Sequence, residues 1–512
     1  MKRWRILIAL ALGVLLAAGC GQSPPVEVST QWEHGIYYQI FVRSFYDSTG
    51  DGVGDLQGII NKLDYLNNGN PSRGKDLGIT GLWLTPIHPS PTYHKYDVTD
   101  YYNIDPEYGT LEDFQELINQ AHSRGIKVLM DLVVNHTSRR HPWFSEALLN
   151  PESKYRDYYI WATDDDNLWE RGEWGQQLWY AAGGGHYYAT FWSEMPDLNM
   201  DNPAVRKELV DIAKFWLDQG VDGFRLDAIK HIYPGSQSDK NNEWWDHFRT
   251  ELEQVKPDIY LVGEVWDNYH VVAPYYKHLD SNFNFDLADR IIDSVFRGSN
   301  LGIASFVSRS HTEFAKHNPN FIDALFLTNH DQNRLFDRLG RNVDKNKVAA
   351  SILLTLPGNP FIYYGEELGM LGRKPDEHIR EPMQWYTDPS SGGQTNWIKP
   401  HHNLPGVTPS VEEQVKEKDS LYLHYRTMIH LRRSHPALLS GGFESIETGD
   451  RRLVGYIRTS PEGDLVVIHN ISTQDLEIDM EEGTKLFFSS SSAASLRKGK
   501  LIVPALSTAI VQ

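Results

Sequence analysis

Short apolar runs alternate with amphipathic stretches along most of the chain from about Trp32 onward. Two of the amphipathic stretches, 111–125 and 205–220, carry apolar residues at helical spacing and end in glycine, as helices commonly do. Strands and helices in alternation predict a parallel sheet, and eight repeats fit a closed (β/α)8 TIM barrel of the α/β class. The eight runs expected to form strands are 36–45, 78–87, 126–136, 221–228, 258–266, 282–287, 323–331 and 359–367.

One connection in this alternation is too long for a single helix. The third expected strand ends at His136 and the next helix begins near Pro203, which predicts an inserted subdomain over residues 137–202. We expect most of the aromatic side chains in the insert to form its small core and some to line a cleft. These aromatic residues are Trp161, Trp169, Trp174, Trp179, Tyr180, Tyr187, Tyr188 and Trp192.

The pattern changes after about His435. Short alternating runs over 452–459, 465–472, 485–490 and 501–511 follow one another without a helical stretch between them. This spacing predicts a C-terminal antiparallel β-sandwich domain over residues 435–512. The barrel is then expected to comprise residues 32–136 and 203–434.

The N-terminus has the pattern of a targeting signal. Three basic residues precede an apolar run over 6–18, which is too short and wrongly flanked for an ordinary membrane span. We therefore predict a signal peptide over residues 1–19 and exclude it from the fold.

Cys20 is the only cysteine of the chain. The sequence before it, Leu16-Ala17-Ala18-Gly19, resembles a bacterial lipoprotein cleavage site, although the usual leucine of such sites would stand at Ala17. We expect an exported protein that is anchored to a bacterial membrane by a lipid on Cys20, with residues 20–31 as a tether. The alternative is a conventional secretory signal with an incidental cysteine.

The amino-acid composition indicates which kinds of molecule the protein can bind. The 512 residues carry a formal net charge of −19, which argues against nucleic acid as a partner because phosphate binding needs clustered Lys and Arg. Aromatic residues make up 12% of the chain, including 15 Trp, and exposed aromatic rings suit the faces of sugars. We expect a monomer.

Three acidic residues end three of the expected strands: Asp227, Glu264 and Asp331. Their common position suggests one cluster, and carboxylate pairs are the catalytic groups of glycosidases. The alternative is three unrelated acids that cap helices or lie in solvent. His136 and His330, beside the ends of two such strands, favour the cluster.

The motifs that contain these residues resemble those of the α-amylase superfamily, glycoside hydrolase family 13. The resemblance covers nearly all of the chain after the signal. It implies that Asp227 is the nucleophile, Glu264 the general acid and base, and Asp331 the acid that holds and distorts the reacting sugar. The matching motifs are DLVVNH (131–136), MPDLN (195–199), GFRLDAIKH (223–231), GEVW (263–266) and TNHD (328–331).

The chemistry explains why these residue types are needed. Arg225 lies two residues before Asp227, so on a strand both side chains point to the same face, and the guanidinium favours the ionised carboxylate. Glu264 needs a raised pKa to act as an acid near neutral pH, and the apolar run 260–262 with Trp266 is expected to supply desolvation. A retaining mechanism predicts carboxyl groups about 5–5.5 Å apart.

The resemblance also implies a sugar-binding subsite. His136 and His330 would bind sugar hydroxyls, and YHKY (93–96) places His94 and Tyr96 where α-amylases carry YHGY, with Tyr96 as a stacking platform. Lys95 replaces the glycine of that motif, which puts the local backbone in doubt because glycine tolerates conformations that lysine does not. The other implied substrate-binding residues are Arg225, Lys230, His231 and Arg334.

The loop DSTGDGVGD (47–55) spaces oxygen ligands as the first half of an EF-hand does. Position twelve is Gly58 rather than glutamate, so the loop is no EF-hand, but it resembles a calcium loop of oligo-1,6-glucosidase-like enzymes. We expect it to bind a structural Ca2+, and a solvated acidic loop is the alternative. The expected ligands are Asp47, Thr49, Asp51, the Val53 carbonyl and Asp55.

A second calcium ion, bridging barrel and insert through Asn135 and the His231 carbonyl, is implied by the resemblance to α-amylases. No ligand from the insert is identifiable in the sequence.

The motifs point to different branches of the family. GFRLDAIKH and YHKY look like α-amylases, whereas the 47–55 loop and REPMQW (380–385) look like oligo-1,6-glucosidases. The combination resembles the intermediary α-amylase subfamily and implies endo-hydrolysis of α-1,4 links in starch or maltodextrin. The alternatives are an exo-acting α-glucosidase or oligo-1,6-glucosidase, a neopullulanase-like or transglycosylating enzyme, and a non-catalytic surface glycan-binding lipoprotein. The C-terminal domain is expected to pack against the barrel, with accessory sugar binding as the alternative.

Overall fold

The structure is a computed structural model that describes residues 32, 34–70, 74–233 and 237–512. The predicted signal peptide, the tether and Cys20 lie outside the described residues. Within the described part of the chain, every helix is too short or too polar to cross a bilayer.

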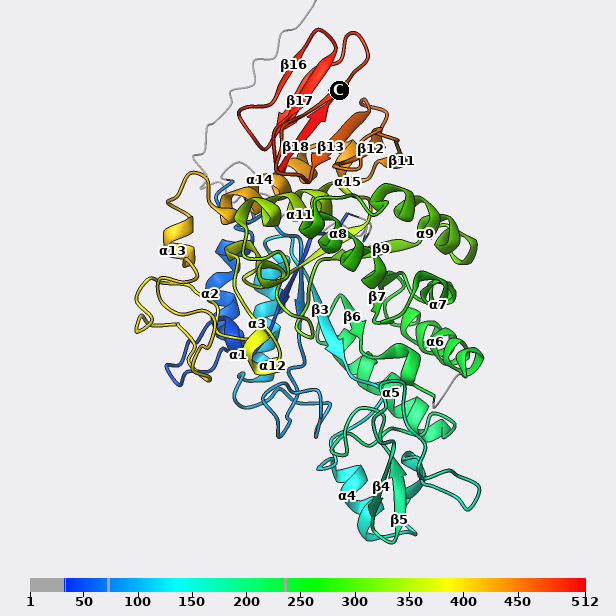
Figure 1. Cartoon of the computed structure of the whole chain (residues 1–512). Coiled ribbons are helices and arrows are strands. Elements are labelled where there is room, and N and C mark those ends of the chain that lie inside the picture. Colours follow the sequence, from blue (N-terminus) through cyan, green and yellow to red (C-terminus); the bar gives the residue numbers. More distant parts are fainter. Residues whose placement is uncertain (1–31, 33, 71–73, 234–236) are drawn as a thin grey trace, which may run out of the picture.

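Eight parallel strands close into a barrel in the order β1-β10-β9-β8-β7-β6-β3-β2. Every residue of these strands is buried, as expected for a parallel sheet that is covered by helices outside and filled by side chains inside. The predicted (β/α)8 barrel is confirmed (Figure 1). The strands are β1 (Tyr37–Ile40), β2 (Gly81–Leu84), β3 (Lys127–Leu132), β6 (Gly223–Leu226), β7 (Tyr260–Gly263), β8 (Ser281–Phe283), β9 (Ile322–Phe326) and β10 (Asn359–Tyr363).

Helices between the strands cover the barrel, and their ends follow local capping signals. A capping box between Thr110 and Asp113 starts α3, and the Asn202 side chain accepts a hydrogen bond from the Ala204 amide at the start of α5. These two helices are the ones predicted over 111–125 and 205–220. The longer barrel helices are α2 (Leu56–Leu66), α3 (Leu111–His122), α5 (Pro203–Asp218), α6 (Ser238–Glu253), α8 (Phe285–Arg297), α9 (Ile303–His317), α11 (Val343–Thr355) and α14 (Leu421–Ser434).

The observed strands are shorter than the predicted runs, and two of the runs include part of an α-helix. The run 36–45 ends in α1 (Val42–Phe45), which begins just after β1. The run 282–287 was expected to be a strand throughout, but β8 ends at Phe283 and α8 begins at Phe285. Asn284 separates the two elements, because its side chain accepts a hydrogen bond from the Leu287 amide and so caps the helix.

Stacked aromatic rings fill the barrel interior below the site. The ring centroids of Tyr37 and Phe361 lie 4.5 Å apart, and those of Trp32 and Tyr260 lie 4.9 Å apart. Such large, tightly packed rings form a rigid floor. The opposite end of the barrel, where the strands end, is left for the loops that form the site.

The predicted insert forms a separate lobe between β3 and α5, at the lower end of the view in Figure 1. Trp179, Tyr187 and Tyr188 are buried in it, whereas Trp169, Trp174 and Trp192 are exposed. Trp161 and Tyr180 are partly buried against the core, so five of the eight aromatic residues pack, as predicted. The insert contains α4 (Pro142–Leu149), β4 (Trp179–Ala182) and β5 (Gly185–Tyr188).

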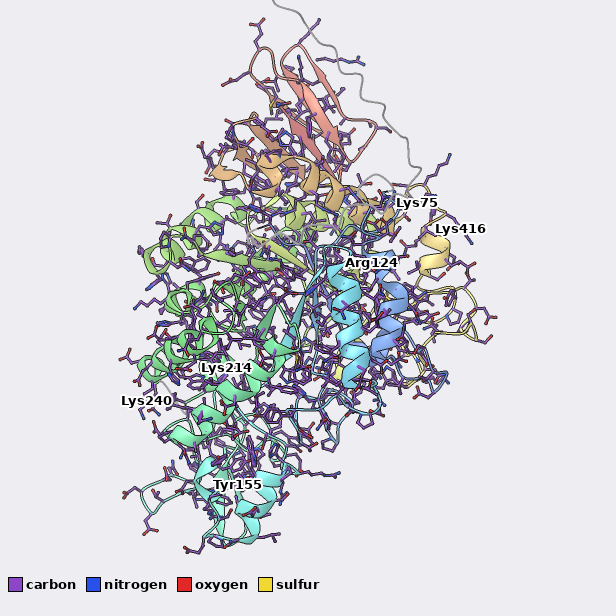
Figure 2. The ribbon with its side chains drawn as sticks, turned by 180° about the vertical axis from the view of Figure 1, so that it is seen from behind. Lys75, Arg124, Tyr155, Lys214, Lys240 and Lys416 are labelled. Atoms are coloured by element: carbon purple, nitrogen blue, oxygen red, sulfur yellow. The ribbon has the colours of Figure 1, made fainter. Side chains whose placement is uncertain are left out.

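The C-terminal region forms two antiparallel sheets, with strand orders β11-β12-β13-β18-β15 and β14-β17-β16, which confirms the predicted β domain. It packs on the barrel through α11, where the Arg458 guanidinium donates to the Thr355 carbonyl (2.6 Å). Figure 2 shows this domain at the opposite end of the molecule from the insert, where Tyr155 is labelled. The strands are β11 (Gly442–Ser445), β12 (Leu453–Thr459), β13 (Leu465–Asn470), β14 (Leu476–Asp479), β15 (Leu486–Ser489), β16 (Ser495–Arg497), β17 (Lys500–Val503) and β18 (Ser507–Val511).

Candidate active site

A cavity of about 520 Å³ opens at the carboxyl ends of the barrel strands. It brings together all three acids that end the predicted strands, Asp227, Glu264 and Asp331. Five further predicted residues line it: His94, Tyr96, His136, Lys230 and His231. Trp174, Phe191, Met195 and Trp266 contribute an apolar wall, and Lys374, Asp376 and Arg380 a charged one.

Arg225 links the acids from below the cavity. Its side chain is fully buried, and Nη1 lies 2.8 Å from Asp131 Oδ1 and 2.5 Å from Asp227 Oδ1. Its other terminal nitrogen, Nη2, lies 2.8 Å from Glu264 Oε2. One guanidinium therefore holds Asp227 and Glu264 close together, because its two terminal nitrogens are rigidly fixed in one plane.

Burial sets different pKa values for the two acids. Burial raises the pKa of Asp227 to about 6, against the opposing effect of Arg225. Burial raises the pKa of Glu264 to about 7, with Arg225 opposing and the charges of Asp227 and Asp331 adding to the rise. The charges of Asp227 and Asp331 thus favour the protonated form of Glu264, while Arg225 favours the ionised form of Asp227, which is the combination that an acid and a nucleophile need.

The backbone after Asp227 fixes which oxygen of Glu264 carries the proton. Ala228 has a φ of +48°, a left-handed conformation that is rare for a residue with a side chain. In this conformation its amide donates to Glu264 Oε2 (3.1 Å). Because Arg225 binds the same oxygen, the proton of the neutral acid is directed to Oε1.

Asp331 stays ionised. Burial acts to raise its pKa, but contacts with His330 Nε2 (3.2 Å) and Arg380 Nη2 (2.8 Å) outweigh burial and hold the pKa well below its usual range. Burial lowers the pKa of His330 to about 3, so the ring is neutral at neutral pH and Arg380 is the positive charge beside Asp331. The sequence shows Arg380 within REPMQW but gives it no role.

A hydrogen-bonded chain orients the predicted platform Tyr96. The Gln39 amide donates to His330 Nδ1 (2.7 Å), which leaves the ring proton on Nε2. His330 Nε2 lies 2.6 Å from the Tyr96 hydroxyl, and that hydroxyl donates in turn to Asp131 Oδ2 (2.9 Å). Tyr96 is thereby fixed in the cavity wall before any ligand binds. His330, predicted to bind sugar hydroxyls, is buried behind Tyr96 and does not line the cavity, so the structure gives it the role of orienting Tyr96.

Lys95 adopts the backbone conformation that the glycine of the YHGY motif would favour. Its φ is +65°, which costs about 1–2 kcal/mol for a residue with a side chain. The buried ammonium lies 2.7 Å from both Asp105 Oδ2 and Glu107 Oε2. These two ion pairs offset the strain, so the departure from glycine leaves His94 and Tyr96 in the cavity wall.

Comparison with known proteins agrees with this geometry. A model of the α-amylase catalytic domain matches residues 39–441, and a model of the C-terminal domain of the α-amylase SusG matches residues 453–510. The chain belongs to the α-amylase family.

Individual members of the α-amylase family are similar over nearly the whole chain. Alpha-amylase 3 of Dictyoglomus thermophilum is 49% identical, over 94% of this chain and 93% of its own. A 4-alpha-glucanotransferase of Thermotoga neapolitana is 36% identical, over 86% of this chain and 96% of its own. The crystal structure of an α-amylase from H. orenii has a TM-score of 0.88 and 50% identity, covering 94% of this chain and 99% of that one.

Two further residues that were predicted to bind substrate, Lys230 and Arg334, lie in different places relative to the cavity. The Lys230 ammonium lies 2.9 Å from Glu173 of the insert and 3.0 Å from Asp267 of the barrel, so it ties the two parts together beside the cavity. Arg334 lies outside the cavity wall. It is buried and donates to the carbonyl oxygens of Ile379 and Tyr364, so the structure does not bring it to the sugar site.

The predicted calcium loop curls around Asp47. The carboxylate of Asp47 accepts hydrogen bonds from the amides of Thr49, Gly50 and Gly52. Asp55 lies close enough for Asp47 to raise its pKa, after the larger effect of burial. Among the described residues no ion pair involves Asp47, Asp51 or Asp55, but Asp55 accepts hydrogen bonds from Ser48 and Gly58 as the cap of α2. The three carboxylates do not converge within 4.8 Å of one another, so calcium binding by this loop stays a prediction.

The predicted second calcium position has an insert residue that the sequence did not reveal. Asn135 Oδ1 is buried and has no hydrogen-bond partner among the described atoms. Beside Asn135 lies Asp197 of the MPDLN motif, whose pKa burial raises to about 7. A buried carboxylate and an orphaned amide oxygen fit a cation, which would favour the ionised form of Asp197.

Proposed function

We propose that the protein is a retaining endo-acting α-amylase, which hydrolyses internal α-1,4 bonds of starch or maltodextrin. Membership of the family makes it a glycoside hydrolase. The observation that supports the proposed roles best is the single guanidinium of Arg225 that contacts both Asp227 and Glu264.

In the first step, Asp227 Oδ attacks the anomeric carbon while the bond to the leaving sugar breaks. Glu264 Oε1 donates its proton to the departing glycosidic oxygen, so the leaving chain is released as an alcohol. The product is a glucosyl ester on Asp227 with inverted configuration. Arg225 stabilises the Asp227 carboxylate before the attack, and its contact with Glu264 Oε2 orients the acid.

In the second step, Glu264 acts as a base. It removes a proton from water, and the hydroxide oxygen attacks the anomeric carbon from the face that the leaving sugar has vacated. The ester bond to Asp227 breaks, and the carboxylate returns to its ion pair with Arg225. Two inversions give a product of retained α configuration.

The remaining cavity residues position the sugar. Asp331 is proposed to accept hydrogen bonds from its hydroxyls, and Arg380 keeps that carboxylate charged. His136 and His94 are neutral near pH 7 because burial lowers the pKa of each to about 4. They therefore bind hydroxyls without competing for the charge of Asp227, and Tyr96 supplies the stacking face.

A second candidate function has support in the relatives. Proteins named as 4-alpha-glucanotransferase and oligo-1,6-glucosidase are similar over 86% of this chain. In a transferase, a sugar hydroxyl replaces water in the second step. The apolar wall of Trp174, Phe191 and Trp266 is suited to hold such an acceptor, so partial transglycosylation is the runner-up activity.

We also propose that structural Ca2+ binds the 47–55 loop through Asp47, Thr49, Asp51, the Val53 carbonyl and Asp55. A further Ca2+ is proposed between barrel and insert at Asn135, Asp197 and the His231 carbonyl. When bound, these ions would stabilise the fold rather than take part in bond cleavage.

We further propose that the signal peptide exports the protein and that a lipid on Cys20 anchors it to the membrane. The enzyme is proposed to act there as a monomer on a polymer outside the cytoplasm. Mass spectrometry of Cys20 from a membrane fraction tests the anchor, and an unmodified thiol would contradict it. Light scattering tests the monomer.

One assay series distinguishes the candidate activities. Soluble starch is incubated beside a nitrophenyl α-glucoside, and proton NMR follows the anomers of the first products. Endo-hydrolysis with retention predicts a rapid fall in starch chain length and α-anomers that appear first. Release of glucose from chain ends alone would indicate the exo-acting alternative, and no turnover would indicate a glycan-binding protein.

A further inference from the structure

Three histidine rings meet beside the charged wall of the active-site cavity. His378 lies in the short helix α12 (Asp376–Ile379), and His401 and His402 lie in a loop about twenty residues later. One ring nitrogen from each lies within 4.8 Å of the other two. Among residues 32, 34–70, 74–233 and 237–512, no other three histidine, cysteine or acidic side chains were found at such spacing.

The buried Glu381 places two of these rings. Its fully buried carboxylate accepts hydrogen bonds from the backbone amides of His401 (2.7 Å), His402 (2.9 Å) and Asn403 (2.9 Å), and from the Asn403 side chain (2.8 Å). These bonds fold the loop around one acid and put a negative charge next to the histidines. The local field therefore favours a cation at this position.

The ring nitrogens of the three histidines are not engaged by the rest of the protein. No hydrogen bond or ion pair in the described part of the chain involves them. The rings instead contact one another: His378 and His401 stack with centroids 4.6 Å apart, and His402 meets His401 edge-on at 4.7 Å. His378 and His402 are half-buried and His401 is exposed, so a small ion can enter from solvent.

We propose that His378, His401 and His402 bind a divalent transition-metal ion of the zinc class. Imidazole nitrogen is a preferred ligand of Zn2+, Cu2+ and Ni2+, whereas calcium takes oxygen ligands, so this site is chemically distinct from the proposed calcium sites. Three histidines with a water molecule in the fourth position make a tetrahedral zinc site. Ligand nitrogens around zinc lie about 3.3 Å apart, so the rings would close in from their spacing of up to 4.8 Å when an ion binds.

The ion would connect the loop to the active-site wall. Lys374, Asp376 and Arg380 line the cavity on either side of His378, and Arg380 forms the ion pair with Asp331. A metal ion that joins α12 to the 401–403 loop restrains this wall. The proposal does not depend on the substrate of the enzyme, since binding and stability report it without turnover.

Metal binding is tested on the mature, folded protein. After treatment with a chelator, the protein is dialysed into metal-free buffer, about five equivalents of CaCl2 are added to fill the proposed Ca2+ sites, and ZnCl2 is titrated in a calorimeter. We expect one Zn2+ per chain in the wild type and binding weakened by about 100-fold or more in His378→Gln and in His402→Gln. His186→Gln, which removes a half-exposed histidine of the insert, is the matched control and should bind as the wild type does.

Two further readouts keep the test decisive. Bound Co2+ should give the strong visible absorbance of a tetrahedral site in the wild type and in His186→Gln, and lose it in His378→Gln. Zn2+ should raise the Tm of the wild type by about 2–5 °C and leave that of folded His378→Gln unchanged. Equal Zn2+ affinity in all variants, or no bound ion in the wild type, would overturn the proposal.

Discussion

Replacing Arg225 by lysine tests the arrangement that links the two catalytic acids. The guanidinium contacts Asp131, Asp227 and Glu264 through two nitrogens, and its side chain is fully buried. A lysine ammonium is a single point charge that cannot reproduce this planar bridge. At least one buried carboxylate then loses its partner.

The structure gives the size and direction of the effect. Asp227 already has a pKa of about 6 because burial outweighs the opposing charge of Arg225. Weakening that charge raises the pKa of Asp227 further, and we expect a rise of about one unit or more, equivalent to about 1.4 kcal/mol. A rise of one unit lowers the ionised fraction of Asp227 by up to about tenfold on the acidic side of its titration. Loss of a buried partner also destabilises the fold by about 3–5 kcal/mol.

The assay is the pH dependence of kcat/KM on soluble maltooligosaccharide. The acidic limb should move to higher pH in Arg225→Lys, while Tm falls. Arg432→Lys is the matched control, because Arg432 is equally buried in α14 but donates only to backbone carbonyls of residues 354, 356 and 358. That control should lose stability and keep the acidic limb. An unchanged acidic limb in a folded Arg225→Lys enzyme would refute the reasoning.

Three other predictions follow from buried or loop charges. Burial raises the pKa of Glu366 to about 8, so its neutral form stabilises the fold fully below the unfolded pKa of about 4.5, and this stability is lost as pH rises through about 8. Glu366→Gln should therefore flatten the fall in Tm between pH 5 and 9, and an unchanged pH profile of Tm would count against the assignment. Lys95→Gly relieves the left-handed strain but leaves Asp105 without its cation, so we expect the free energy of unfolding, measured in urea, to fall by about 1–3 kcal/mol. A gain in stability would show that the ion pairs contribute less than the strain costs. Removal of Ca2+ by EDTA should lower Tm, and Asp51→Asn should reduce the effect of added Ca2+ on Tm whereas the exposed insert variant Asp165→Asn should not.

Much of the fold could be predicted because the barrel strands are buried along their whole length. A fully buried strand is a continuous apolar run, so the sequence shows its position directly. Where an acid or histidine follows a barrel strand, it then lies at the carboxyl edge of the barrel. Asp227 and Glu264 could be found in this way, since each directly follows its strand.

The contacts that the sequence did not reveal join segments far apart in the chain. Arg380 meets Asp331 across 49 residues, and Asp197 approaches Asn135 only because the insert folds back on the barrel. Neither pairing follows from local spacing. The environment of Lys95 was also hidden, because its compensating acids Asp105 and Glu107 lie in the next loop segment.

The error in the run 282–287 has a local cause. Asn284 interrupts an apolar stretch, and an amide side chain at that position caps a helix better than it continues a buried strand. Apolar content alone could not locate that boundary.

The most direct test of the account is to trap the covalent intermediate. The Glu264→Gln variant is incubated with a fluorinated maltosyl fluoride, whose fluoride leaves without acid assistance, and the labelled protein is digested for peptide mapping by mass spectrometry. We expect one sugar ester per chain, on Asp227. A stable label on Asp331 or on the substituted side chain at position 264, or first products of β configuration from the wild-type enzyme, would contradict it.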